Sequence, residues 1–247
     1  MIVKEIIAKS ILSKSQVYDY ALNAYVGCQH KCLYCYAKFM KRFTGHREPW
    51  GDFVDIKINA SELLALEVKK KTLGRVWISG VCDAYQPLEK KYQLTKGCIE
   101  ILVNNGWPFT VQTKSPLVIR DIEILKKCAD CEVGFTITTS DENVRKIFEP
   151  NAPPIAKRVE ALSILHTAGI RTFVLIAPML PGVEGLVGML KGNVDYVLID
   201  RLNYHYADWA FKKQGMQWAM DDDFFDQKGE ELRAGLEKAG IACRKLF

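Results

Sequence analysis

The sequence NAYVGCQHKCLYCY (residues 23–36) contains three cysteines, Cys28, Cys32 and Cys35, in a C-x3-C-x2-C spacing. Three thiolates on one short loop are suited to hold three irons of a cubic iron–sulfur cluster. The fourth iron then has no protein ligand in the loop and is free to bind another group. The stretch therefore predicts a 4Fe–4S centre around which the rest of the chain is arranged.

Two other interpretations of the loop compete with the cluster. A structural zinc site needs four ligands, and the nearest fourth ligands are His30 and His46. Because His30 lies between two of the cysteines, its coordination would be strained. The remaining alternative is three buried cysteines without a ligand role, which leaves their tight spacing beside aromatic residues unexplained. We therefore favour the cluster.

Composition limits the class of protein. The chain has 247 residues, 49% hydrophobic and 26% charged, as in a soluble globular protein. No apolar run approaches the ~18 residues of a membrane span, and the first residues, MIVKEIIAKS, do not form a secretory signal. We expect a cytoplasmic protein without a membrane partner. Its eight cysteines then favour metal binding or chemistry over disulfides, and its net charge of +5 permits, without requiring, a phosphate-bearing partner.

Apolar runs and helical periodicities alternate along most of the chain. The expected strands are Leu22–Val26, Phe53–Ile58, Arg75–Val81, Phe109–Thr113, Glu132–Thr139, Arg171–Ala177 and Tyr196–Ile199. The expected helices are Leu33–Phe43, Ala60–Lys71, Tyr92–Asn105, Val118–Lys127, Glu142–Phe148, Ile155–Ala168 and Gly185–Lys191, with one more after Asp221. This alternation predicts an α/β fold with parallel strands, a partial (β/α)6 TIM-like barrel. We expect a single domain over residues 1–247, with an outer N-terminal segment (1–22) and a C-terminal helical extension (204–247).

The cysteine spacing, with an aromatic residue at Tyr34, resembles the signature of the radical S-adenosylmethionine superfamily. Its flanks resemble more narrowly the spore photoproduct lyase-like family, which is also described as DNA repair photolyase-like. Further stretches are similar in the same order: SGVCDAYQPLEKKYQLT (79–95), VQTKSPLVIRDIEIL (111–125), TITTSDENVRKIFEPNAPPIAKRVEAL (136–162) and IAPMLPGV (176–183). The resemblance thus covers residues 18–183.

The resemblance implies a mechanism. S-adenosylmethionine would bind the open iron, and one electron from the cluster would cleave it to a 5′-deoxyadenosyl radical that abstracts a substrate hydrogen. The electron would come from a donor such as flavodoxin or ferredoxin. The family implies DNA as substrate. The alternatives are modification of a small molecule, RNA or peptide, or an iron–sulfur electron carrier or sensor, which would not need the strand-end residues described next.

Residues that follow the predicted strands are expected to meet at one edge of the barrel. By resemblance, Gly80, after Ser79, would receive the methionine amino group. Lys114 and Arg158 have the charge to bind its carboxylate. The further residues expected near the cofactor are Tyr34, Asp83, Thr138, Thr139, Ser140 and Ala177, with Asp200, Arg201 and Asn203 after the last strand. By analogy with the hydrogen-donating cysteine of spore photoproduct lyases, Cys82 or Tyr85 is the expected catalytic residue.

Two features lie outside this set. Cys128 and Cys131 form a second C-x2-C, for which packing, a redox pair or an auxiliary cluster with Cys98 or Cys243 are the alternatives. The basic segment Lys38–Arg47 contains no acidic residue. It is either a solvated helix face or a docking surface for a phosphate-bearing substrate near the cluster.

Overall fold

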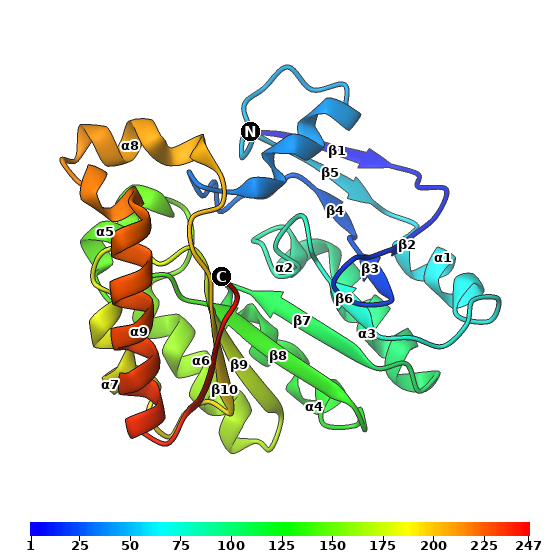
Figure 1. Ribbon diagram of the computed structural model, residues 1–247. Helices are drawn as coiled ribbons and strands as arrows, with labels where there is room; N and C mark the ends of the chain where they lie inside the picture. The colour runs from blue at the N-terminus through cyan, green and yellow to red at the C-terminus, as the bar shows by residue number, and fades with distance from the viewer.

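The computed structural model describes residues 1–247 and is built on an eight-stranded sheet of order β11-β10-β9-β8-β7-β6-β3-β2 (Figure 1). Its strands are β2 (Leu12–Lys14), β3 (Tyr20–Leu22), β6 (Val76–Ile78), β7 (Phe109–Thr113), β8 (Cys131–Thr136), β9 (Arg171–Ile176), β10 (Tyr196–Ile199) and β11 (Ala242–Lys245). All neighbours are parallel except β2 and β3. The edge strands β2 and β11 do not pair with each other, so the sheet stays open. The predicted α/β class with parallel strands is confirmed.

The helices alternate with these strands. They are α1 (Ala60–Glu67), α2 (Glu89–Tyr92), α3 (Leu94–Asn104), α4 (Ile122–Leu125), α5 (Glu142–Phe148), α6 (Ile155–Thr167), α7 (Leu186–Leu190), α8 (Asp208–Lys213) and α9 (Asp222–Lys238). Short 3-10 helices are η1 (Tyr36–Phe43), η2 (Pro116–Asp121), η3 (Val183–Gly185), η4 (His205–Ala207) and η5 (Gln217–Met220). Helix α6 packs on β8 and β9, and α9 on β11. The strands are apolar because helices cover their outer face.

Several predicted strands end earlier than expected. β6 ends at Ile78 and β8 at Thr136, so Ser79 and Thr138 stand in the loops that follow. The predicted strand Leu22–Val26 is divided between two sheets: Leu22 ends β3, whereas β4 (Tyr25–Val26) joins a small sheet of order β1-β5-β4. Its other strands are β1 (Ile2–Ile6) and β5 (Phe53–Lys57). This small sheet carries the cysteine loop, which begins just after β4.

The helix predicted over Leu33–Phe43 is wrong at its start. The structure has irregular turns up to Cys35 and a 3-10 helix from Tyr36. Leu33 donates its backbone N–H to the carbonyl of Phe148 at 2.8 Å, far along the chain. A backbone held by such a distant acceptor cannot continue the local hydrogen bonds of a helix. The loop conformation is therefore imposed by tertiary contact.

The two ends of the chain also contribute strands. The N-terminal segment supplies β1, β2 and β3, and β3 lies inside the main sheet beside β6. The C-terminal extension contains the expected helix α9, with Phe225, Leu232 and Leu236 buried, but it then returns as β11 along β10. That strand was not predicted from the sequence. None of the helices combines the length and apolar character needed to cross a membrane.

Candidate functional site

The three loop cysteines lie at the carboxyl end of the main sheet as free thiols, with Cys28 and Cys32 buried and Cys35 partly buried. Burial, then the charges of Asp83 and of the other two thiols, raise the pKa of Cys28. Burial raises the pKa of Cys32 to about 12, against the opposing effect of Lys114. Thiols buried together without a cation would stay protonated. A bound metal would stabilise all three as thiolates.

Several donors around the loop are suited to thiolate ligands. The backbone N–H groups of His30 and Ala37 lower the pKa values of Cys28 and Cys35 against the opposing effect of burial. The buried indole N–H of Trp50 has no hydrogen-bond partner, yet it lies close enough to Cys35 to lower the pKa of that thiol. Hydrogen bonds to cluster sulfurs stabilise the charge of the cluster and tune its potential. The donor set therefore fits a cluster held by three thiolates.

The two histidines considered as the fourth ligand of a zinc site contact carboxylates instead. His30 Nδ1 lies 3.2 Å from Asp83 Oδ2. His46 Nε2 lies 2.8 Å from Asp55 Oδ1, and its other ring nitrogen lies 3.2 Å from Glu48 Oε2. No three His, Cys, Asp or Glu side chains converge closely enough to hold a single metal ion. This geometry does not favour a zinc site, whereas in a cubic cluster each thiolate binds a separate iron.

Asp83 ties the cysteine loop to the end of β7. Its carboxylate accepts hydrogen bonds from the Thr113 hydroxyl (2.6 Å), the Lys114 backbone N–H (2.8 Å) and the Tyr85 backbone N–H (2.9 Å), besides its contact with His30. Burial opposes ionisation, but His30 and these donors together hold the pKa of Asp83 below its usual range. Since its oxygens are occupied, Asp83 positions the loop.

Glu149 is a second buried hub, at the other side of the loop. It accepts a hydrogen bond from the Tyr34 hydroxyl and another from Thr138 Oγ1 at 3.0 Å. Arg158 Nη2 lies 2.5 Å from Glu149 Oε2, although the two atoms are not aligned for a hydrogen bond, and Lys114 Nζ lies 4.0 Å from Oε1. Both Glu149 and Arg158 are fully buried. Arg158, predicted to bind a carboxylate, thus already has one within the protein.

Lys114 is held less closely by Glu149 than Arg158 is. Its ammonium lies 5.7 Å from the Tyr34 ring centroid, and its side chain is 14% exposed. Burial alone would lower the pKa of Lys114, but Cys32 and Glu149 outweigh burial and raise it. The charged amine therefore stands between the cysteine loop and the buried carboxylate, where an anionic group of a ligand would find it.

The predicted Ser79–Gly80 turn contacts the cysteine loop. Ser79 has a φ of 69°, a left-handed conformation rare outside glycine. The Gly80 carbonyl accepts a hydrogen bond from the Tyr36 hydroxyl, and a Cβ at Gly80 would come within 3.0 Å of the Trp77 ring. Cys82 Sγ lies 3.3 Å from Ser79 Oγ and packs with the apolar residues around the loop. Gly80 and Cys82 are therefore brought to the cysteines as expected.

Other predicted residues are more distant or already bonded. Tyr85 is fully buried, with the Arg120 guanidinium 5.8 Å from its ring centroid, so a substrate could reach it only after a rearrangement. Ser140 and Thr139 donate their hydroxyls, each at 2.6 Å, to the carbonyls of Gly182 and Pro181. These bonds fix the turn after β8.

The ends of β9 and β10 are more open. Ala177 follows β9 and is partly buried. The Asp200 backbone N–H donates a hydrogen bond to the carbonyl of Ile176, the residue before Ala177. Asn203 donates to Asp200 at 2.9 Å, and Arg201 pairs with Asp222 at 3.0 Å. A role for these residues in cofactor binding stays a prediction.

Cys128 and Cys131 lie at the amino end of β8, the opposite edge of the sheet. A hydrogen bond with the Cys131 thiol lowers the pKa of Cys128 to about 7. Cys98 is buried in α3, and Cys243 lies in β11. A redox or auxiliary-cluster role for Cys128 and Cys131 stays a prediction.

A column of aromatic rings runs outward from the Gly80 turn. The rings of Tyr36 and Tyr204 stack with centroids 6.1 Å apart, and those of Tyr204 and Tyr206 with centroids 5.9 Å apart. Tyr204 is 48% exposed and Tyr206 39% exposed. Lys38 Nζ lies 5.3 Å from the Tyr206 ring centroid. This column was not predicted, because Tyr36 and Tyr204 come from opposite ends of the sequence.

Glu149 and Trp50 were not predicted as site residues from the sequence. Glu149 stands in the stretch IFEPNAPP (147–154), which carries part of the resemblance. No motif or periodicity around Trp50 predicts a role for it in the site. Both were missed because their contacts with the loop depend on the fold.

The family of the chain follows from comparison with known proteins. A model of the radical SAM superfamily matches residues 22–185. The chain belongs to the radical S-adenosylmethionine superfamily of enzymes, as the cysteine spacing predicted. That family implies a 4Fe–4S cluster and S-adenosylmethionine as cofactors.

Relatives in sequence are uncharacterized. A protein of Methanocaldococcus jannaschii is 35% identical over 187 residues, which cover 74% of this chain and 70% of that protein. A protein of Mycobacterium bovis is 28% identical over 190 residues, which cover 72% of this chain and 56% of that protein. A protein of Acidianus two-tailed virus is 32% identical over 171 residues, with coverages of 66% and 56%. The chain thus spans little more than half of the last two relatives.

Solved structures agree with the fold. Spore photoproduct lyase complexed with dinucleoside spore photoproduct matches with a TM-score of 0.74 at 13% identity, over 99% of this chain and 82% of that one. Streptococcus suis SuiB bound to the precursor peptide SuiA matches with a TM-score of 0.61 at 13% identity, over 92% and 48%. At these identities the likeness establishes the radical SAM fold and leaves the substrate open.

Proposed function

We propose that this enzyme binds a 4Fe–4S cluster through Cys28, Cys32 and Cys35 and modifies a nucleic acid, with DNA as the favoured substrate. The observation that carries the proposal is the buried three-thiol loop, set at the carboxyl edge of an open parallel sheet beside Gly80 and Lys114. When bound, the reduced cluster supplies the electron that cleaves S-adenosylmethionine and so generates a hydrogen-abstracting radical.

The protein's own part is to position and shield. Asp83 and Glu149 hold the loop rigid from two sides through His30 and Tyr34. In the proposal the Gly80 backbone faces the amino group of S-adenosylmethionine, and Lys114 is the cation for its carboxylate. Arg158 acts indirectly, since its charge balances Glu149 and leaves Lys114 free for the ligand. Thr138, Ser140 and Ala177 would border the nucleoside part.

The aromatic column supports the choice of a nucleic acid. Stacked rings that carry a nearby cation are the usual platform for unstacked bases. Tyr204 and Tyr206 expose such rings beside Lys38, next to the turn that Tyr36 contacts. Cys82, partly buried near the loop, is the proposed hydrogen donor, a role that in this arrangement Tyr85 could take only after moving.

Two alternatives remain in view. The first is a radical SAM enzyme that acts on RNA, a peptide or a small molecule; it would bind the same cluster and differ from the proposal only in its substrate. An iron–sulfur carrier or sensor would not cleave S-adenosylmethionine. We keep the cytoplasm as the expected location, where a flavodoxin or ferredoxin can supply the electron.

The first experiment tests the chemistry. Protein reconstituted anaerobically with iron and sulfide is mixed with dithionite and S-adenosylmethionine, and 5′-deoxyadenosine is measured by chromatography. Product is expected from the wild type and not from the variant with all three loop cysteines replaced by alanine. A reconstituted wild type that binds the cluster and forms no 5′-deoxyadenosine would refute the enzyme and favour the carrier.

The second experiment tests the substrate class. Binding of a thymine-rich single-stranded oligonucleotide is measured by fluorescence anisotropy over a range of salt concentrations. Tyr206→Ala removes the outermost ring of the column and is expected to weaken binding by about 1–3 kcal/mol for one lost stacking contact. The matched control is Trp218→Ala, an aromatic side chain that is 53% exposed outside the column. Equal affinities of the two variants would remove the support for a nucleic acid.

A further inference from the structure

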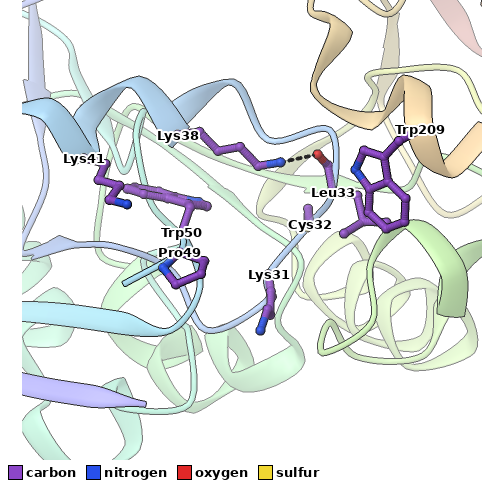
Figure 2. A pocket seen from close by; sticks show the side chains of 8 residues that line it. All are labelled: Lys31, Cys32, Leu33, Lys38, Lys41, Pro49, Trp50 and Trp209. Carbon is purple, nitrogen blue, oxygen red and sulfur yellow. Dashed lines mark hydrogen bonds between the residues drawn. The ribbon is translucent and has the colours of Figure 1, made fainter. Parts of the chain in front are cut away.

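A hollow of about 340 Å³ opens on the outer side of the cysteine loop. Figure 2 shows Lys38 and Lys41 extending from η1 along one side, Lys31 below, and Trp209 of α8 across the opening. Cys32 is one of its lining residues, so the hollow reaches a predicted cluster ligand. Its remaining lining residues are Leu33, Pro49 and Trp50.

The rim of the hollow is basic. Lys31 pairs with Asp52 at 2.6 Å, but Lys38 and Lys41 donate only to the backbone carbonyls of Leu33 (2.5 Å) and Arg47 (2.9 Å). No carboxylate therefore neutralises these two ammonium groups. The segment that carries them, Lys38–Arg47, also lacks acidic residues. These two ammonium groups and this segment concentrate positive charge at the opening.

The floor of the hollow differs from its rim. Trp50 is 7% exposed, and Pro49 and Leu33 add apolar surface, while Trp209 stands at the edge with 57% of its surface exposed. An exposed tryptophan beside an apolar floor within a charged rim is the composition of a protein-docking site. The rings that favour a base, those of Tyr204 and Tyr206, do not line this hollow, although Lys38 lines it and also lies 5.3 Å from the Tyr206 ring centroid.

We propose that this hollow is the docking site of an acidic one-electron carrier protein, which reduces the cluster through the Cys32 side of the loop. The proposal rests on the proposed function, because only a chain that carries the cluster needs this electron. The carrier loses one electron and the cluster gains it, with no bond made or broken and no proton moved. The carrier's acidic residues would face Lys38 and Lys41, and Trp209 would be the exposed apolar contact at the edge of the hollow.

The test compares two reductants on the reconstituted full-length protein. The probes are dithionite, a small reductant that needs no docking site, and photoreduced flavodoxin, an acidic protein. The bleaching of cluster absorbance is followed by anaerobic stopped flow. Lys41→Glu reverses a charge on the rim, Trp209→Ala removes the apolar contact, and Lys70→Glu is the matched control on an exposed lysine beyond α1.

Lys41→Glu is expected to slow reduction by flavodoxin about tenfold at low ionic strength, and less as salt rises. Trp209→Ala should slow it through weaker binding, which calorimetry with flavodoxin would detect. Dithionite should reduce the cluster of every variant at the wild-type rate. Flavodoxin should reduce the cluster of Lys70→Glu at the wild-type rate as well. Equal flavodoxin rates for all variants, or a wild-type cluster that dithionite reduces and flavodoxin does not, would overturn the docking site.

The same variants separate the other outcomes. If Lys41→Glu loses oligonucleotide affinity but keeps its flavodoxin rate, the hollow belongs to the nucleic acid and the docking proposal is wrong. If the wild type binds no cluster at all, the proposed function fails before the docking site is reached. Iron content, measured on every sample, distinguishes these two failures.

Discussion

Replacing Glu149 by glutamine should destabilise the protein and loosen the cysteine loop together. The substitution keeps the size of the side chain and an oxygen that can accept from Tyr34, but it removes the negative charge beside Arg158. Both partners of that ion pair are fully buried, at 2.5 Å separation. Arg158 would then remain as a buried cation without its carboxylate partner, close enough to Lys114 to lower the pKa of that lysine.

Two magnitudes agree on the size of the effect. Breaking a buried ion pair by removing one partner costs about 3–5 kcal/mol. Burial opposes ionisation of the Glu149 carboxyl. Arg158 and Lys114 outweigh burial and lower the pKa of this carboxyl from 4.5 to about 2. That drop corresponds to roughly 3 kcal/mol. Against a total stability of about 5–15 kcal/mol for a typical domain, the variant should fold with a clearly lower urea midpoint.

The pH dependence gives a second, independent readout. Because folding lowers the pKa of Glu149, its contribution to stability is complete above pH 4.5 and is lost as the pH falls toward 2. The difference in unfolding free energy between wild type and Glu149→Gln should therefore be largest near neutral pH and shrink through this range. The assay is urea unfolding followed by circular dichroism at several pH values, with iron content measured after reconstitution.

The matched control is Glu160→Gln. Glu160 pairs with Lys157 at 2.7 Å on the surface of α6, where both side chains are more than half exposed. An exposed pair contributes about 0–1 kcal/mol. If Glu149→Gln lowers stability no more than this control, or if its effect is the same at pH 3 and pH 7, the assignment of Glu149 as a charged hub is wrong.

Further predictions concern the loop itself. Gly27→Ala should cost roughly 1–2 kcal/mol from its φ of 94° alone, and more because the new Cβ would lie 2.3 Å from the Phe53 carbonyl oxygen. Gly188→Ala, inside helix α7 with open space around it, should instead leave stability unchanged or raise it by up to about 1 kcal/mol, as thermal unfolding would show. Alanine at all three loop cysteines should abolish iron binding and the brown colour, whereas alanine at Cys128 and Cys131 should leave both intact; retained iron in the first variant would contradict the cluster assignment.

Much of the fold could be predicted because its signals are local. Apolar runs such as Phe173–Ile176 and the helical periods between them alternate regularly, and that alternation is sufficient to indicate parallel strands. Element ends were less accurate. Strand β8 ends at Thr136 because the chain then turns, through the hydrogen bond of Thr139 to Pro181, toward a contact distant in sequence. Strand β11 was missed because Ala242–Lys245 becomes a strand only through pairing with β10.

The sequence by itself determined the family and predicted the cluster ligands, since three cysteines in a fixed spacing act as a unit wherever the fold places them. Only the tertiary structure decided which groups surround that unit. Glu149 and Asp83 became the supports of the loop, Trp50 its unpartnered donor, and Tyr204 the partner of Tyr36. These contacts join residues far apart in the chain, and buried charges and stacked rings acquire partners only when the sheet brings them together.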